Sequence, residues 1–280
     1  MKKVKIIVCC HKEDIFKHSD VYMPLHVGKA LSDMDLGIPE DNTGDNISNK
    51  NDSYCELTGM YWAWKNLKEI DYIGLCHYRR YFDFNQVGRK VFPLSTIKTA
   101  QFNELNLDIS KEAEKWLKKG RCILAKANHQ HASLFTHYCE GHYSEDIKKL
   151  GDIIRDTLPP KYYDAFINSL IKSNRFSPYN MFVMNWNTFD QYCNWLFNIL
   201  GKLENQIDIS HYSPYQKRVF GYLAERLLNL YVHAEQLKVM QVPVLKISDE
   251  EETDNIPLIK YFIRSILRDF AVKVTAEVPR

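Results

Sequence analysis

Cationic and aromatic side chains follow an apolar run in the first third of the chain. The run Tyr72–Cys76 is typical of a buried strand, and His77, Tyr78, Arg79 and Arg80 come directly after it. Ligands of open α/β sheets bind beyond the carboxyl ends of the strands, so a ligand is expected at these side chains. Because a guanidinium donates paired hydrogen bonds to phosphate oxygens, Arg79 and Arg80 indicate a diphosphate.

A diphosphate that leaves in a group-transfer reaction gains negative charge, which has to be stabilised in the transition state. A divalent metal held by an Asp-x-Asp motif is one common solution, and the prediction assumes that no such motif occurs anywhere in this chain. Arg79 or Arg80 is therefore predicted to replace the metal, while Mg2+ or Mn2+ stays open as a cofactor. The structural alternative, equally favoured by sequence position, is that these arginines pair with acids such as Asp83.

A polar loop in the N-terminal part is the predicted nucleoside site. Residues 37–53 are rich in Asn, Asp and Gly, which is the composition of a loop with several turns. Long ordered loops inside compact domains are often functional. Asp45 is the first candidate to hold a uracil edge and ribose hydroxyls, with Asn46 and Asn49 in support. For each single residue, plain turn chemistry is the simpler interpretation, and a mobile surface loop is the alternative for the segment.

An acceptor hydroxyl needs a carboxylate that takes up its proton. Glu225 is the candidate, because it lies on the helix face opposite the apolar stripe of a well-capped helix that starts at Ser213-Pro214. Asp190 and Asp45 are the alternative bases. The simpler interpretation is a solvated Glu225 that pairs with a neighbour on its own helix, namely Arg218, Arg226 or Asn229.

The surrounding elements alternate between strands and helices, which predicts an α/β fold. Four runs are expected to form buried strands, namely Lys5–Cys10, Tyr72–Cys76, Arg121–Ala125 and Tyr179–Met184. Helices are expected around 27–31, from a capping box at Ser53-x-x-Glu56, over 161–171, over 188–203 and from 213 onward. The first strand is followed by a polar segment that begins at His11.

The segment Asn128–His142 carries four histidines, at 129, 131, 137 and 142. Their spacing matches no zinc motif, and no HExxH is present. A solvated histidine cluster on a loop is the favoured interpretation, and a metal site is the minority alternative.

The C-terminal part is predicted to be an acidic linker, from Ser248 to Asp254, followed by an amphipathic helix over 257–274. Lys260, Arg264 and Arg268 recur at helical spacing opposite apolar residues. Such a helix can dock on the core, pair with another subunit or lie on an anionic membrane surface. Docking on the core is the most common of these outcomes.

Composition excludes several classes of protein. The formal net charge of +2 is too small for non-specific nucleic-acid binding, so no nucleic-acid partner is expected. The seven cysteines form no CxxC pair, which predicts buried thiols in a reducing compartment. The N-terminal apolar stretch is too short for a signal peptide, and no run is long enough to cross a membrane. A cytoplasmic location is therefore expected, with peripheral contact at the inner face of the plasma membrane as an extension.

Word-like motifs across the chain resemble the bacterial DUF4422 family. They are Asp45–Ser48, Tyr54–Asn66, Tyr72–Phe82, Tyr179–Phe182, Tyr192–Phe197 and Arg218–Leu228, and the resemblance covers roughly residues 3–233. It implies a GT-A-like (Rossmann-like) glycosyltransferase with a mostly parallel central sheet flanked by helices and a helical C-terminal portion. Residues 1–247 would form the glycosyltransferase domain, and residues 248–280 the linker and C-terminal helix.

The family is associated with capsule, exopolysaccharide and O-antigen loci. The resemblance therefore implies transfer of galactofuranose or galactose from a UDP-sugar to a glycan or an undecaprenyl-linked acceptor. The predicted donor-binding residues are His11, Asp45, Asn46, Asn49, His77, Tyr78, Arg79 and Arg80. The predicted acceptor-binding residues are Tyr179, Asn180, Arg218 and Glu225, and the predicted catalytic residues are Glu225, Arg79 and Arg80. A non-catalytic carbohydrate-binding or scaffold subunit is the alternative, and a nuclease or nucleotide hydrolase is a weaker one.

Overall fold

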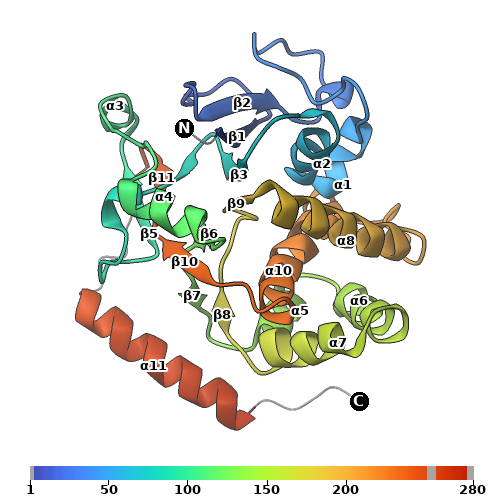
Figure 1. The fold of residues 1–280 in the computed structure, drawn as a ribbon. Helices are drawn as coiled ribbons and strands as arrows, with labels where there is room; N and C mark the ends of the chain where they lie inside the picture. Colours follow the sequence, from blue (N-terminus) through green and yellow to red (C-terminus); the bar gives the residue numbers. More distant parts are fainter. Residues whose placement is uncertain (1–2, 251–256, 276–280) are drawn as a thin grey trace. The chain divides into compact units, whose positions relative to one another are not determined.

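The computed structural model describes residues 3–250 and 257–275, which group into two compact units (Figure 1). The first unit contains Met1–Lys126, Tyr179–Gln191 and Lys238–Asn255. The second contains Ala127–Pro178, Tyr192–Leu237 and Ile256–Arg280. The domain boundary expected at residue 247 stays a prediction. Most of the acidic linker expected at 248–254 lies outside the described residues.

The first unit is built on a nine-stranded sheet. Its strands are β1 (Val4–Cys10), β2 (Tyr22–His26), β3 (Tyr72–His77), β4 (Arg80–Phe82), β5 (Leu94–Ile97), β6 (Cys122–Ala125), β9 (Phe182–Asn185), β10 (Val239–Val242) and β11 (Val244–Ile247). The main order is β10-β6-β9-β3-β4-β11-β5, and β1 lies between β3 and β2. The predicted α/β class is therefore confirmed.

The sheet mixes both strand directions more evenly than we expected. The parallel pairs are β1–β2, β1–β3, β6–β10 and β5–β11. The antiparallel pairs are β3–β4, β3–β9, β6–β9 and β4–β11. Apolar runs predict burial but carry no information on strand direction, which the connections between strands decide.

The strand β3 lies at the centre of this sheet because β1 and β9 pair with it directly. Gly74 allows the close approach: a Cβ atom there would lie 2.8 Å from the Phe182 carbonyl oxygen and 3.1 Å from Ile6. Any larger residue would push the strands apart. The buried side chains Ile6, Val8 and Cys76 share one face of the sheet and belong to one apolar core.

The helical elements of the first unit are short. They are η1 (Lys29–Leu31), η2 (Ser48–Lys50), α1 (Asn51–Tyr54), α2 (Leu57–Asn66), η3 (Phe84–Gln86), α3 (Thr99–Phe102) and α4 (Lys111–Lys118), together with the start of α8 (Trp186–Glu204). The helix expected around 27–31 is thus a single 3-10 turn. The helix expected from Ser53 is interrupted at Cys55, whose φ is 52°.

The predicted capping box at Ser53 is wrong. The Ser53 hydroxyl donates to the Lys50 carbonyl at 3.2 Å instead of capping a helix. Glu56 precedes α2, and its carboxylate accepts a hydrogen bond from the Asn180 side chain at 2.7 Å. A partner from a distant part of the chain has therefore replaced the local capping contact.

The polar loop is ordered around the buried carboxylate of Asp41, which is 0% exposed. It accepts hydrogen bonds from the backbone N–H groups of Gly28 and Lys29 at 2.9 and 3.1 Å, and from the hydroxyls of Ser48 and Thr58. One side chain thus ties η1, η2 and α2 together, and the Asp41 N–H donates to the His26 carbonyl at the end of β2 at 3.0 Å. The loop is therefore held by specific hydrogen bonds to its neighbours.

The second unit is mostly helical. Its elements are β7 (Asn128–His129), α5 (Leu134–Gly141), α6 (Ser144–Thr157), α7 (Pro160–Phe166), the π-helical turn η4 (Ile167–Ile171), β8 (Arg175–Phe176), α9 (Pro214–Lys217), α10 (Val219–Ala234) and α11 (Leu258–Thr275), together with the end of α8. The helices predicted over 161–171, over 188–203 and from 213 are confirmed. The Ser213 hydroxyl accepts from the Gln216 N–H, as expected of an N-cap.

The C-terminal helix expected over 257–274 is confirmed as α11. It contacts β7, but its larger apolar side chains are turned to solvent. Within the described residues, no helix combines the length and the apolar composition that a membrane span requires.

We expect Asp41→Ala to lower the thermal unfolding midpoint by roughly 5–10 °C. The reason is that buried N–H and hydroxyl donors would lose their acceptor, at a combined cost of about 3 kcal/mol. Differential scanning fluorimetry measures the shift. Asp45→Ala, at an exposed position of the same loop, is the matched control and should change the midpoint far less. Equal shifts for the two variants would show that Asp41 does not anchor the loop.

Candidate active site

Two parallel strand ends bring the first candidate residues together. The pairing of β1 with β3 sets Cys9 beside His77, and the Tyr78 N–H donates to the Cys9 carbonyl at 3.2 Å. A tight two-residue turn follows, since His77 pairs with Arg80 across β3 and β4. The ring of His11, just beyond β1, contacts the Tyr78 ring edge-on at a centroid distance of 5.3 Å. The ends of β1 and β3 therefore lie side by side, and the residues that follow them meet at one edge of the sheet.

Arg79 forms an ion pair, although with an acid other than the one we considered. Its Nε donates to the Asp14 carboxylate at 2.8 Å, and the Asp14 side chain is only 8% exposed. Asp83 instead accepts from the Asn85 N–H at the start of η3. The structural interpretation of Arg79 is thus favoured, because its charge already has a compensating carboxylate.

Arg80 differs from its neighbour. Its guanidinium lies over the Tyr179 ring, with Cζ 4.7 Å from the centroid. Its Nε is buried without a hydrogen-bond partner, and no carboxylate in the described part of the chain pairs with Arg80. A partly buried cation without a counter-charge is costly, so the site favours an incoming anion.

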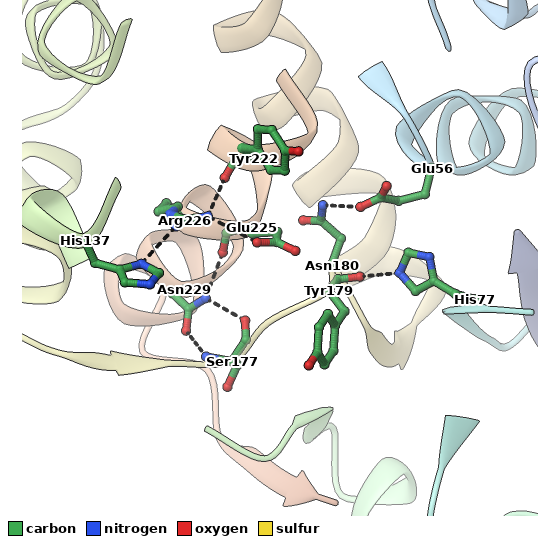
Figure 2. Close-up of polar contacts among 10 residues, drawn as sticks. All are labelled: Glu56, His77, His137, Ser177, Tyr179, Asn180, Tyr222, Glu225, Arg226 and Asn229. Atoms are coloured by element: carbon green, nitrogen blue, oxygen red, sulfur yellow. Dashed lines mark hydrogen bonds and ion pairs between the residues drawn. The ribbon is translucent and has the colours of Figure 1, made fainter. Parts of the chain in front are cut away.

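The Tyr179-Asn180 segment is a tight turn, where we expected the start of a strand. Both residues have left-handed backbone angles, with φ of 73° and 51°, and β9 begins only at Phe182. The Nε2–H of His77 donates to the Tyr179 carbonyl at 2.7 Å, and the Asn180 amide donates to Glu56 (Figure 2). These two distant contacts hold a backbone that local sequence disfavours. His77 therefore orients Tyr179, beside Arg80.

The predicted nucleoside residues lie on the ordered loop. Asp45 exchanges two backbone hydrogen bonds with the Asn66 amide and accepts from the Tyr61 hydroxyl at 3.2 Å. Gly44 has a φ of 58°, and a Cβ there would come within 2.0 Å of the Asn66 oxygen. Asn46 caps its own turn through the Ser48 N–H. Asp45 and Asn49 are exposed.

The candidate base Glu225 lies in the second unit, on α10. Its carboxylate accepts from the Arg226 guanidinium at 3.1 Å and is 18% exposed, so the pairing alternative is realised without full solvation. Asn229, one helical turn on, donates to the Ser177 and Glu225 carbonyls (Figure 2). Arg218 stacks on the Tyr222 ring at 5.2 Å. The alternative base Asp190 accepts from the Trp64 indole at 2.7 Å.

Arg226 was expected only as a possible partner of a solvated Glu225, and its burial was not predicted. It is 3% exposed and lies over the Phe176 and Tyr138 rings, at 4.6 and 5.4 Å. A second guanidinium nitrogen donates to Nδ1 of His137 at 3.2 Å, which requires that nitrogen to be unprotonated. In the sequence, Arg226 directly follows the proposed base Glu225, and this adjacency could have pointed to Arg226 as a candidate residue.

The four histidines do not form the solvated cluster that we predicted. His129 pairs with Asp269, His131 with Glu140, His137 with Arg226 and His142 with Gln216. Only His131 among them is classed as exposed. Burial, and then the Arg226 charge, lowers the pKa of His137 to about 4. Helix α5 carries His137, and His142 directly follows its last residue; both side chains are partly buried, which the composition of the segment did not reveal.

The assumption that the chain has no Asp-x-Asp is wrong, because Asp33-Met34-Asp35 is one. Both aspartates are exposed, and Asp35 accepts from the Gly37 N–H at 2.8 Å as part of a turn. Within residues 3–250 and 257–275, no group of three or more His, Cys, Asp or Glu side chains is arranged to hold a metal ion.

The family described as "Domain of unknown function (DUF4422)" matches residues 5–236. The chain belongs to the DUF4422 family. This DUF4422 chain is also similar to the apo structure of the bifunctional glycosyltransferase WbbM, at 32% identity and a TM-score of 0.80. A search of curated proteins found no match.

The similarity covers 91% of this DUF4422 chain and 47% of the WbbM chain, so the protein corresponds to about half of that bifunctional enzyme. A TM-score of 0.80 means a shared fold, which confirms the predicted glycosyltransferase-like α/β architecture.

Two substitutions at Asn180 separate its two roles. Asn180→Gly keeps the left-handed turn but loses the bond to Glu56, so we expect a loss of about 2 kcal/mol in unfolding free energy. Asn180→Ala also strains the backbone and should cost about 1 kcal/mol more. Chemical denaturation measures both. If Ala and Gly behave alike, the turn conformation does not constrain this position.

We expect His137 to make the folded protein less stable as the pH is lowered. The unfolded state takes up its proton below about pH 6.5, while the folded state stays neutral until about pH 4, so folding weakens across this window. For a half-buried group the loss is about 1–2 kcal/mol. His137→Asn keeps an acceptor for Arg226 and does not titrate there. Its stability, measured by denaturation between pH 7 and pH 4, should therefore fall less than that of the wild type; parallel profiles would contradict the assignment.

Proposed function

We propose that this DUF4422 protein is a glycosyltransferase that uses a nucleoside diphosphate sugar as donor. The observation that carries the proposal is Arg80, a cation with no carboxylate partner in the described residues, which begins β4 opposite His77 at the carboxyl end of β3. The similarity to a bifunctional glycosyltransferase over 91% of this chain supports it.

The chemistry explains why a cation is needed there. When the acceptor oxygen bonds to the anomeric carbon, the bond between that carbon and the donor phosphate oxygen breaks. Its electron pair goes to the diphosphate, which leaves with additional negative charge. Arg80 would stabilise this charge in the transition state, and stacking on Tyr179 limits the orientations of its guanidinium. Because Arg79 is already paired with Asp14, it would act on the diphosphate through its positive charge at a distance more than through direct hydrogen bonds.

The remaining donor contacts are proposed on the surrounding loops. His11 and Tyr78 flank the strand ends, and their paired rings offer a surface for a sugar or a base. Asp45, Asn46 and Asn49 would read the uracil and ribose, on a loop that Asp41 holds in place. We propose UDP-galactofuranose or UDP-galactose as the donor.

A divalent metal fits the strand ends poorly. Two carboxylates of the first unit that flank the candidate residues are already bonded, Asp14 by Arg79 and Glu56 by Asn180. Mg2+ needs several free oxygen ligands, whereas the side chains at this edge are mainly cationic or aromatic. Arginine, and not a metal ion, is therefore the proposed stabiliser of the leaving diphosphate.

The acceptor side is proposed separately. Glu225 would take the proton from the acceptor hydroxyl, and the adjacent Arg226 would keep its carboxylate oriented. Tyr179, Asn180 and Arg218 are the proposed acceptor contacts. A glycan or an undecaprenyl-linked saccharide of a capsule, exopolysaccharide or O-antigen is the proposed acceptor, which implies a cytoplasmic enzyme at the inner membrane face.

The test compares Arg80→Gln with Arg121→Gln. Both arginines belong to the first unit and stack on an aromatic ring, Arg121 at 4.0 Å from Trp116, but only Arg80 pairs with the residue at the carboxyl end of β3, His77. Millimolar UDP should raise the thermal midpoint of the wild type and of Arg121→Gln, and much less that of Arg80→Gln. With a panel of UDP-sugars, transfer by Arg80→Gln should fall by roughly 10²–10³-fold.

Several outcomes would contradict the proposal. If no nucleoside diphosphate shifts the wild-type midpoint, the donor assignment fails. Sugar binding without nucleotide binding would favour the non-catalytic carbohydrate-binding or scaffold subunit instead. Full activity of Arg80→Gln, with an unchanged fold by circular dichroism, would remove the role of Arg80. Loss of activity on EDTA treatment would show that a metal, and not arginine alone, stabilises the leaving group.

A further inference from the structure

The C-terminal helix α11 has two faces with different surroundings. One face contacts β7: Ser265 and Val272 are 6% and 4% exposed, and Asp269 pairs with His129 at 2.6 Å. Arg268 on the same side donates to the His129 carbonyl at 2.8 Å. These contacts fix the helix rotation, so the orientation of the other face is determined within the second unit.

The outward face is an apolar stripe. It consists of Ile259, Ile263, Ile266, Leu267 and Phe270, which are 70%, 54%, 68%, 64% and 69% exposed. Their spacing of i, i+4, i+7, i+8 and i+11 places them along one side of the helix. These are five of the nine large hydrophobic side chains exposed in the described part of the chain, so the exposure is concentrated and not scattered.

Cations flank this apolar stripe on both edges. Lys260 and Arg264 lie along one edge of the stripe. Lys273 lies along the other edge, because it is seven residues, or about two turns, after Ile266. All three side chains are exposed. The single acid among the described side chains of the helix, Asp269, is turned to the opposite face by His129. An apolar band with a cationic border complements an anionic lipid surface, where the band enters the acyl region and the cations meet the headgroups.

We propose that α11 binds the protein to anionic membranes, with the stripe facing the bilayer and the helix lying in its plane. A second copy of the chain is a poorer occupant, because pairing two stripes would bring the Lys260 and Arg264 edges of both copies together. The helix is too polar to cross the bilayer. The acidic run Asp249–Asp254 precedes the helix in sequence and weakens the attraction without removing the stripe.

This inference is independent of the sugar donor, since it concerns a surface of the second unit and its readout is lipid binding. If the proposed function also holds, the contact brings the enzyme to the surface where a lipid-linked acceptor is embedded.

Vesicle co-sedimentation with the full chain tests the proposal. Wild-type protein should sediment with phosphatidylglycerol–phosphatidylcholine vesicles and only weakly with phosphatidylcholine alone. Ile263→Glu/Phe270→Glu should lose binding to both, because charge enters the apolar stripe. Lys260→Ser/Arg264→Ser should lose affinity for the anionic vesicles by roughly tenfold or more, and added salt should reduce wild-type binding in the same way. Leu31→Glu is the matched control, since Leu31 is 51% exposed outside the stripe, and it should bind like the wild type.

Three results would overturn the proposal. The first is wild-type protein that stays in solution with all vesicles. The second is unchanged binding by the stripe variants, including the milder Ile266→Ser and Leu267→Ser should the double Glu variant fold poorly by circular dichroism. The third is sedimentation equilibrium that shows a wild-type dimer and a monomeric stripe variant without lipid, which would assign the stripe to a second copy of the chain.

Discussion

The first unit depends on the close packing of β3 between β1 and β9. Gly74 permits it, since a Cβ atom at this position would collide with the backbone of β9. The parallel pairing with β1 sets the position at which β3 ends, and the antiparallel pairing with β9 brings the turn before Phe182 toward that same end. The candidate site follows from these two registers, because its side chains come from the residues just beyond them.

Polar contacts then convert strand ends into a defined site. His77 holds the Tyr179 carbonyl and Glu56 holds the Asn180 amide, so two left-handed residues are stabilised where an ordinary turn would relax. Tyr179 in turn supports the Arg80 guanidinium. The result is a cation with restricted motion and no carboxylate partner in the described residues. Arg79, one residue earlier, is instead compensated by Asp14. The difference between adjacent arginines is the reason why Arg80 carries the functional proposal.

In the second unit, by contrast with Arg80, the buried cation has a carboxylate partner. Arg226 is buried between aromatic rings, and both a carboxylate and a neutral histidine accept its hydrogen bonds. Burial of this charge is tolerated because the Glu225 carboxylate compensates it, although the Arg226 Nε has no hydrogen-bond partner. At α11 the opposite is found: polar groups fix the inner face, and apolar groups are left outward. A helix that buried its apolar side against the core would show the reverse arrangement.

Several features were determined by the amino-acid sequence alone. Apolar runs identified β1, β3 and β6, and the family motifs indicated a glycosyltransferase-like chain, because burial patterns and word-like motifs are local properties. The C-terminal amphipathic helix was also predictable from its period. The position of His77, Arg79 and Arg80 just beyond a buried strand was also predictable, because the apolar run ends at Cys76.

Only the tertiary structure decided which of these residues have partners. Glu56 looked like a helix cap, but Asn180 takes its carboxylate, and the two positions lie 124 residues apart. The pairing of Arg79 with Asp14, the anchoring of the loop by Asp41 and the burial of Arg226 likewise depend on chain segments that meet only after folding. Hydrogen bonds and ion pairs act over a few ångströms in space, so residue spacing along the chain could nominate the candidates but could not tell a compensated arginine from an uncompensated one.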